Sequence, residues 1–391
     1  MSESQGEAAE RQFLFEFKIK EEKMKKLIVL LFVPMLLVNC GSKDGDGMDA
    51  DRFDRAAMLT NWADNLIIPA FSDFVTQLQT MDDAVAAFSA SPSTQNLTDL
   101  RTAWLDAYKA WQWVDMYDIG KAEKITLRNY INVYPVASAD MVATLLSGSY
   151  DLSSVNRQDE QGFPALDYLL HGLAETDEAI VAFYTDGTDG AKYKQYLKDV
   201  SARMLSLSQS VLDDWTGGYR DTFVDRSGSS ATESVNKLVN DYLFYYEKHL
   251  RAGKVGIPAG VFSTNPLPDR VEALYSGHSK VLFNEALDAA QAFFNGIHFG
   301  NTTDGISLDD YLLEVNAVRE GEDLAALIDG QFSTSRTAAI GISDDFSTQV
   351  GTNNTLMLQA YDALQANVVY MKVDMLQALN INVDYVDGDG D

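Results

Sequence analysis

Residues 97–118 read LTDLRTAWLDAYKAWQWVDMYD. Apolar and aromatic side chains recur in this stretch at intervals of three and four residues, which places them along one face of an α-helix. They are Leu100, Ala103, Trp104, Ala107, Trp111, Val114 and Tyr117. Ser93 stands where an N-cap residue would lie, and Gly120 follows the stretch as a C-cap residue would. The stretch therefore predicts a long helix with one buried face.

The same helical period recurs along the rest of the chain, and no segment alternates polar and apolar residues for long enough to predict a sheet. The further helical stretches are residues 54–80, 191–215, 232–250, 278–295, 323–333 and 355–379. Pro69 is expected to kink or split the first of them. We therefore predict an all-α fold.

Residues 216–230, rich in Gly, Ser and Asp, divide the helices into two groups. Bundles with short connections are an economical way to bury helical stripes. We expect two four-helix-bundle-like domains packed side by side, at residues 52–222 and 230–380. Gly and Pro are denser at residues 134–164 and 253–268, so irregular segments are expected there.

Cys40 is the only cysteine of the chain. Lys25 and Lys26 precede the apolar residues 27–38, and a lipobox-like site ends at the cysteine, which is the layout of a bacterial lipoprotein signal peptide. The apolar run is shorter than the roughly 20 residues that span a bilayer. A buried structural cysteine is the alternative.

This interpretation assigns the N-terminal residues and the location of the protein. Residues 1–23 precede the expected start at Met24, residues 24–39 form the signal peptide, and residues 40–51 form a flexible acidic tether. Lipid on Cys40 would anchor the protein to the outer membrane of a bacterial cell envelope, on its periplasmic face or at the cell surface.

Charge excludes one class of partner. The sequence has 58 acidic and 30 basic residues, a formal net charge of −28, which repels nucleic acid. An acidic surface attracts cations, but solvation of an exposed surface explains the same composition. Hydrophobic residues make up 46% of the chain, which is enough for a large core.

Few residues have the spacing of a catalytic or metal site. No His-x-x-x-His pair occurs among the four histidines, which excludes a zincin-type protease. Asp167 and His171 are four apart and would share a helix face, where they could be two metal ligands or simply pack. His278, near a helix start, fits a site or a cap equally, and His249 is expected near a helix end. Arg101 and Asp115 would be either a buried pair or surface residues.

Five segments, in matching order, together resemble the imelysin-like family, once called insulin-cleaving membrane proteases. They are LRTAWLDAYKAW at 100–111, INVYP at 131–135, GFPALDYLLHG at 162–172, KHLRAGKVGIPAG at 248–260 and VEALYSGHS at 271–279. The resemblance spans roughly residues 55–375. It implies two helical bundles, a place in the bacterial envelope, a role in iron acquisition, and chemistry based on a Gly-x-His-x-x-Glu motif.

The chain departs from that motif. Gly162 matches its glycine, but Pro164 stands in place of the histidine and Asp167 in place of the glutamate. Because proline offers no ligand atom, we expect a non-enzymatic binding protein of bacterial iron uptake. The alternatives are a metal-dependent peptidase of the imelysin type, which would use Asp167, His171 and a distant carboxylate, and an envelope scaffold.

The resemblance also implies a binding groove between the two bundles. Its candidate residues are Asp167, Lys254, Glu272, Ser276 and His278. The two acids would supply negative charge, Lys254 an anion contact, and Ser276 and His278 hydrogen bonds. Iron or another divalent metal is the candidate cofactor, with Asp167 and His171 as its candidate ligands. Iron, an iron chelate or an envelope protein is the candidate partner.

Overall fold

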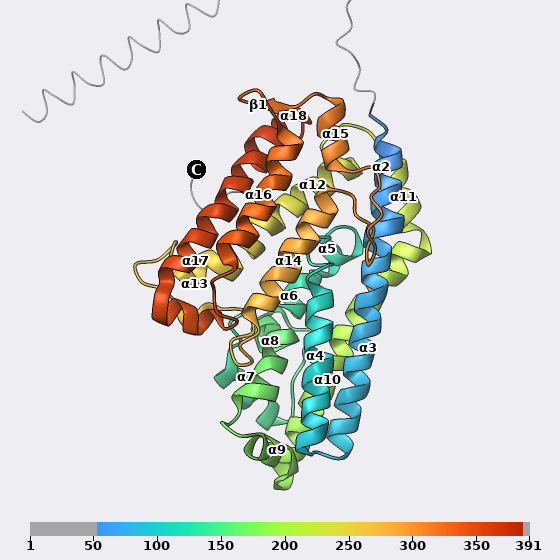
Figure 1. Cartoon of the computed structure of the whole chain (residues 1–391). Coiled ribbons are helices and arrows are strands. Elements are labelled where there is room, and N and C mark those ends of the chain that lie inside the picture. Colours follow the sequence, from blue (N-terminus) through green and yellow to red (C-terminus); the bar gives the residue numbers. More distant parts are fainter. Residues whose placement is uncertain (1–52, 386–391) are drawn as a thin grey trace, which may run out of the picture. The chain divides into compact units, whose positions relative to one another are not determined.

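Long helices make up most of residues 53–385, the part of the chain that the computed structural model describes (Figure 1). The α-helices are α2 (Arg55–Asn61), α3 (Ile68–Ala90), α4 (Thr94–Trp111), α5 (Lys121–Ile125), α6 (Leu127–Ile131), α7 (Ser138–Ser147), α8 (Gly162–Asp167), α9 (Asp177–Thr185), α10 (Gly187–Asp214), α11 (Arg220–Asp225), α12 (Ser234–Phe244), α13 (Ile257–Ala259), α14 (Ser279–Phe294), α15 (Leu308–Glu314), α16 (Leu324–Ala339), α17 (Phe346–Val369) and α18 (Leu376–Ala378). Two short strands, β1 (Val318–Arg319) and β2 (Glu322–Asp323), pair antiparallel. The prediction of an all-α fold is confirmed.

Several α-helices continue without a break into π-helical turns. These turns are η1 (Trp62–Ile67), η3 (Tyr168–Gly172), η4 (Trp215–Tyr219), η5 (Tyr245–Gly256) and η7 (Tyr370–Met375). Short 3₁₀ turns form η2 (Val155–Glu160) and η6 (Pro268–Arg270). Single π-helical turns inside α-helices are rare and are frequent at functional sites. Here η3 carries His171 and η5 carries Lys254, two of the residues that the sequence singles out.

Helix α4 confirms the predicted buried stripe but not its predicted end. The Ser93 side chain accepts a hydrogen bond from the amide of Asn96 at 3.2 Å, and Trp104 and Trp111 are almost fully buried. The helix ends at Trp111 rather than near residue 118, in turns that bond three residues back. Gly120 is not its C-cap. It precedes α5 with a φ of 61°, and a Cβ there would lie 2.4 Å from the Tyr219 ring.

Two other predictions of breaks need correction. Pro69 is the second residue of α3, directly after η1, so the helical chain runs from residue 55 to residue 90 without being split. The widened turn of η1, in which the Ile68 amide bonds five residues back to the carbonyl oxygen of Ala63, lies directly before this proline, which has no amide hydrogen to donate. Residues 134–164 contain α7 and η2, and residues 253–259 are helical, so neither segment is irregular throughout.

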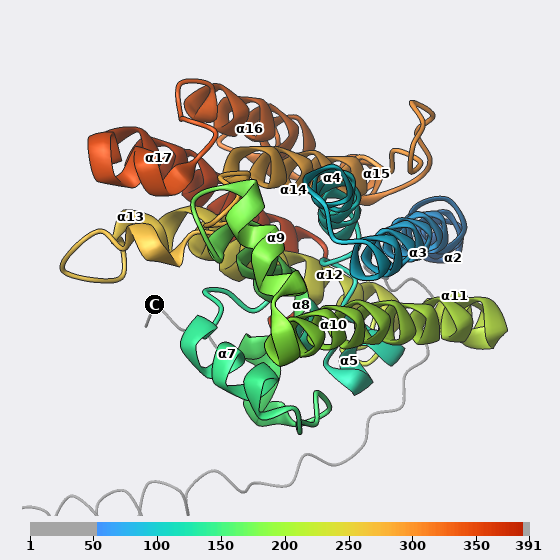
Figure 2. The same cartoon turned by 90° about the horizontal axis from the view of Figure 1, so that it is seen from below.

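The helices pack in two sets of neighbours. Helix α3 lies against α4 and α10, while α17 lies against α16 and η5, and α14 contacts α16, η5 and α4 (Figures 1 and 2). Residues 53–385 belong to one compact unit, and their buried hydrophobic side chains form a connected core. The division into domains at residues 52–222 and 230–380 stays a prediction.

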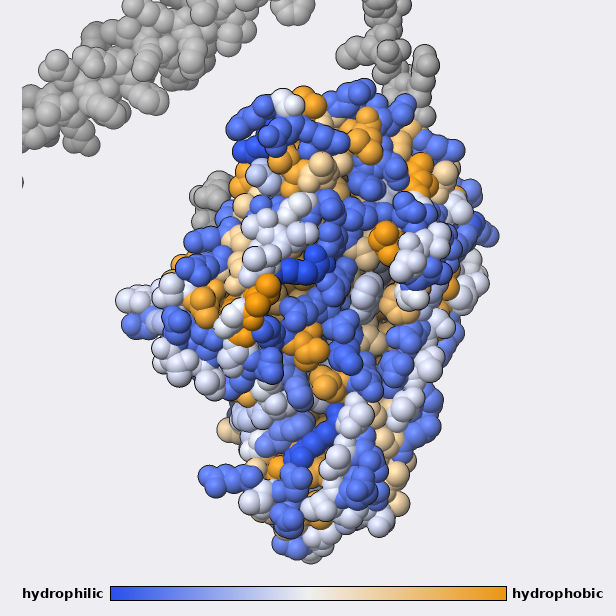
Figure 3. All heavy atoms as spheres, viewed as in Figure 1, coloured by the Kyte–Doolittle hydropathy of each residue, from blue (hydrophilic) through white to orange (hydrophobic). Residues whose placement is uncertain are grey.

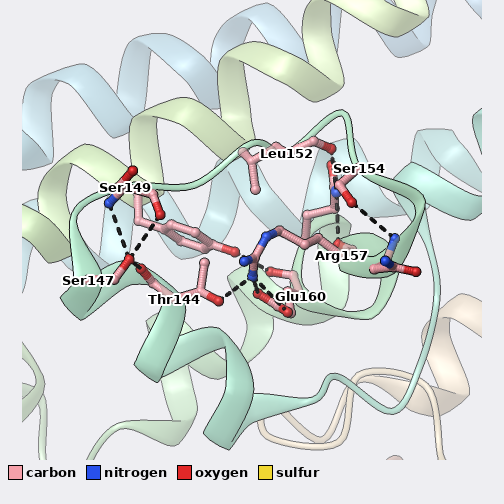
Figure 4. A network of polar contacts seen from close by, with 10 residues as sticks. Thr144, Ser147, Ser149, Leu152, Ser154, Arg157 and Glu160 are labelled. Carbon is pink, nitrogen blue, oxygen red and sulfur yellow. Dashed lines mark hydrogen bonds and ion pairs between the residues drawn. The ribbon is translucent and has the colours of Figure 1, made fainter.

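A polar network fixes the segment that leads to α8 (Figure 4). The Arg157 guanidinium donates to Glu160 Oε2 at 2.7 Å and also reaches the Thr144 hydroxyl. Gly162 then begins α8 with a φ of 77°, and a Cβ at this residue would lie 2.2 Å from the carbonyl oxygen of Ile131. Only glycine fits this close approach, so the network and the glycine together set where α8 and its last residue, Asp167, lie.

The predicted signal peptide (24–39), the lipid site at Cys40 and the tether (40–51) fall outside the described residues. Within residues 53–385, none of the helices combines the length and the apolar character that crossing a membrane requires.

Candidate functional site

Asp167 joins α8 to the loop at residues 271–278. Its Oδ2 accepts a hydrogen bond from the amide of Tyr275 at 2.8 Å, and its Oδ1 accepts one from the amide of Ser276 at 3.0 Å. The side chain is almost fully buried. Burial, together with the nearby Glu272 carboxylate, raises the pKa of Asp167 to about 7 against the opposing effect of the hydrogen bonds from Tyr275 and Ser276. Two predicted site residues, Asp167 and Ser276, are therefore in direct contact.

Lys254 and Glu272 form a buried ion pair. The two side chains are 3% and 1% exposed, so their charges lie beneath the surface. Gln112 and Asn132 complete their hydrogen bonds: Lys254 Nζ donates to Gln112 Oε1 at 2.8 Å, and Asn132 Nδ2 donates to Glu272 Oε1 at 2.8 Å. The Tyr108 hydroxyl in turn donates to Asn132 Oδ1. Lys254 thus pairs with another candidate residue and does not face solvent.

Two histidines lie beside this buried layer. The rings of His171 and His278 have centroids 6.5 Å apart, and both flank Trp104, at 5.3 Å and 6.3 Å. Burial, with the charge of Arg101, lowers the pKa of His171 to about 3, and burial also lowers the pKa of His278. Both imidazoles are therefore neutral near pH 7, the form that binds metals. Nε2 of His171 is buried without a hydrogen-bond partner in the described part of the chain.

The structure positions the other charged candidates differently from the sequence expectation. Arg101 donates to Asp177 at 2.8 Å and to the Leu170 carbonyl oxygen, which holds η3 in place. It does not pair with Asp115. His249 lies within η5, not at a helix end, with the Phe244 ring 5.6 Å away. His278 occupies the N-cap position of α14, but its side chain makes no capping hydrogen bond.

A second charged cluster contains Asp115, which the sequence singled out beside Arg101, but its partner is Arg128. Arg128 of α6 is bonded to Asp115 at 2.7 Å and lies 3.4 Å from Asp118 and 3.7 Å from Asp241. Burial raises the pKa of Asp241 to about 7 and also raises that of Asp118, against the lowering effect of Arg128. Gln112 and Asn132 were missed, because a single uncharged amide carries no signal of its own in the sequence.

Metal ligation by Asp167 and His171 stays a prediction. The hydrogen bonds of Asp167 go to the two loop amides. His171 lies in a π-helical turn, where residues four apart no longer stack as they do in an α-helix. Within residues 53–385, no cluster of three or more His, Cys, Asp or Glu side chains is arranged to hold a metal ion.

Asp167→Asn is expected to flatten the pH dependence of stability. The pKa of Asp167 rises from 3.8 to about 7 on folding. Between these values the folded protein keeps a proton that the unfolded chain has released, so the free energy of unfolding falls as pH rises. The variant should lose a slope of up to about 1.4 kcal/mol per pH unit. Urea unfolding from pH 4.5 to 7.5 measures it.

The exposed Asp140 of α7 supplies the matched control, because its carboxylate is already solvated. Asp140→Asn should leave the slope unchanged. If Asp167→Asn kept the full slope of the parent protein, Asp167 would not be the titrating group.

Comparison with known proteins gives the relationship. The imelysin family model matches residues 67–369. Iron-regulated protein A of Synechococcus elongatus is 21% identical over 326 residues, which cover 79% of this chain and 84% of that protein. Two crystal structures share the fold. One, described as an iron-regulated protein A precursor from Parabacteroides distasonis, has a TM-score of 0.69 at 19% identity and covers 84% of this chain and 96% of its own. An imelysin-like protein from Psychrobacter arcticum has a TM-score of 0.64 at 18% identity, covering 85% and 97%. Because the family model matches well over half of its residues, this chain belongs to the imelysin family.

Proposed function

We propose that this chain is a non-enzymatic binding component of bacterial iron uptake, anchored to the outer membrane through lipid on Cys40. Membership of the imelysin family supports an iron-related role, as do the names of its relatives, among them iron-regulated protein A. The signal-like sequence that ends at Cys40 supports the anchor.

One observation carries the proposed location of the site. Two π-helical turns, η3 and η5, bring His171 and Lys254 to the loop that bears Glu272, Ser276 and His278. We call His171, Ser276 and His278 the loop site. They are half-buried, whereas Asp167, Lys254 and Glu272 lie buried beneath them. In this arrangement the buried layer holds the loop, and the three half-buried side chains meet the ligand.

The donor set favours iron that arrives already chelated. Two neutral imidazoles can each occupy one coordination position of a metal ion. Neither His171 nor His278 belongs to a group of three or more metal-ligating side chains within residues 53–385. A chelator that fills most positions of the metal itself would therefore bind here better than the bare ion. Pro164, which stands where the family motif has histidine, offers no further ligand.

Calorimetry with ferric citrate tests the proposal on purified residues 45–391. We expect one-to-one binding that weakens at least tenfold in the His171→Ala/His278→Ala variant. Citrate alone and Zn²⁺ serve as the chelator and bare-ion controls. His298→Ala removes a histidine outside the loop site and should leave the affinity unchanged.

Two outcomes would contradict the proposal. One is equal affinity of the parent protein and the double variant for ferric citrate. The other is cleavage of casein by the purified protein that a chelator abolishes and added metal restores, which would favour the peptidase alternative. Circular dichroism confirms that each variant is folded.

A further inference from the structure

A cavity of about 430 Å³ opens between α3, α4, α14 and the loop at residues 297–301. It shares no residue with the loop site or with the buried layer beneath it. Helices α4 and α14 lie on the face drawn in Figure 3, where hydrophilic residues predominate around scattered hydrophobic ones. A volume of this size is typical of sites for small organic molecules.

Two aromatic rings line the cavity. Trp113, which follows α4, and Phe299 meet edge to face with their centroids 5.5 Å apart, and both are half-buried. The loop that carries Phe299 is held in place, because the Phe299 amide donates to the carbonyl oxygen of Asn65 at 2.9 Å. Tryptophan presents the best aromatic face for a cation.

The same cavity has an excess of carboxylates. Glu285 of α14 accepts a hydrogen bond from Trp113 Nε1 at 2.9 Å, and Asp73 of α3 accepts one from Gln77 at 3.3 Å. Within residues 53–385 neither carboxylate has an ion-pair partner. Asp106 does, because Lys109 lies 3.1 Å from it. The lining of the cavity thus carries three carboxylates and one ammonium group, that of Lys109. This excess of negative charge would repel an anion.

We propose that this cavity binds a small organic cation, one with a primary ammonium or guanidinium group. Glu285 and Asp73 neutralise the charge, and Trp113 and Phe299 contact the apolar body of the ligand or the cation itself. The volume exceeds what a single ammonium group fills, which favours a ligand with a carbon chain. The same chemistry occurs in free amines and in arginine or lysine side chains of another protein.

Calorimetry at 150 mM salt with agmatine, which carries both cationic groups, tests the site on purified residues 45–391. We expect one-to-one binding that Glu285→Gln weakens at least tenfold, because glutamine keeps the acceptor for Trp113 but loses the charge. Phe299→Leu should weaken it several-fold. The matched control is Asp140→Asn, which removes one exposed carboxylate of α7 and should change nothing.

A blocked peptide, Gly-Arg-Gly, separates the two sources of the cation. Binding of agmatine alone identifies a free amine, and binding of the peptide identifies a protein side chain. Both results support the cation site if Glu285→Gln weakens them. The proposal is overturned if neither probe binds, if glucose binds equally well, or if Asp140→Asn weakens binding as much as Glu285→Gln.

Discussion

Replacing Glu272 with leucine is expected to lower the free energy of unfolding by about 3–5 kcal/mol at pH 7. The variant leaves the charge of Lys254, only 3% exposed, without its partner. Gln112 and Asn132 also lose the carboxylate that accepts their hydrogen bonds. Breaking one member of a buried ion pair costs more than the pair contributes, because the remaining charge stays desolvated. Urea unfolding followed by circular dichroism measures the loss.

The double variant Lys254→Met/Glu272→Leu separates the charge from the packing. Removing both charges leaves no unpaired ion, so the double variant should recover at least half of the loss. Full recovery is not expected, because Asn132 Nδ2 still lacks its acceptor and Gln112 Oε1 lacks its donor. A double variant as unstable as Glu272→Leu would show that hydrogen bonding and shape, rather than charge, dominate this pair.

Arg128→Met is expected to cost a similar amount, about 3–5 kcal/mol at pH 8, and clearly less at pH 5. Without the guanidinium, Asp115, Asp118 and Asp241 lie close together with no counter-charge. The pKa values of Asp118 and Asp241 are already raised by burial, and losing Arg128 raises them further. As pH falls, these carboxyls take up protons in the folded variant and the repulsion disappears.

Urea unfolding of the parent protein and the variant at both pH values measures this effect. Arg226→Met is the control, because Arg226 is exposed, and it should change stability by less than about 0.5 kcal/mol at either pH. An equal penalty for Arg128→Met at pH 5 and pH 8 would show that lost packing, not carboxylate repulsion, accounts for the cost.

The all-α fold could be predicted from local sequence patterns. The end of α4 was predicted wrongly, because it depends on residues that are distant in sequence. The stripe of α4 and its Ser93 cap could be predicted because both depend on neighbours within one helix. The end of α4 could not. Arg128 donates both to the carboxylate and to the carbonyl oxygen of Asp115, a partner 13 residues away. This carbonyl oxygen therefore bonds to a distant side chain rather than to a backbone amide of a continuing helix. The spacing of apolar residues within residues 97–118 gives no indication of that bond.

The candidate site was predictable only in part. The resemblance to imelysins selected Asp167, Lys254, Glu272, Ser276 and His278, and the structure brings these residues together in one region. The resemblance could not reveal that Lys254 and Glu272 form a buried ion pair, because their hydrogen-bond partners Gln112 and Asn132 lie far away in sequence. Among the candidate residues, His171, Ser276 and His278 are half-buried, whereas Asp167, Lys254 and Glu272 are buried.

The hydrogen bonds of Asp167 also have a consequence for the order in which the chain folds. They join α8 to amides 108 and 109 residues further along the chain. Contacts over such separations form late in folding, because closing the long loop between them costs chain entropy that local helices do not have to overcome. A chain still emerging from synthesis carries Asp167 well before Tyr275 exists. The candidate site thus requires residues from both halves of the chain, and a fragment of either half would lack the hydrogen bonds that join Asp167 to Tyr275 and Ser276.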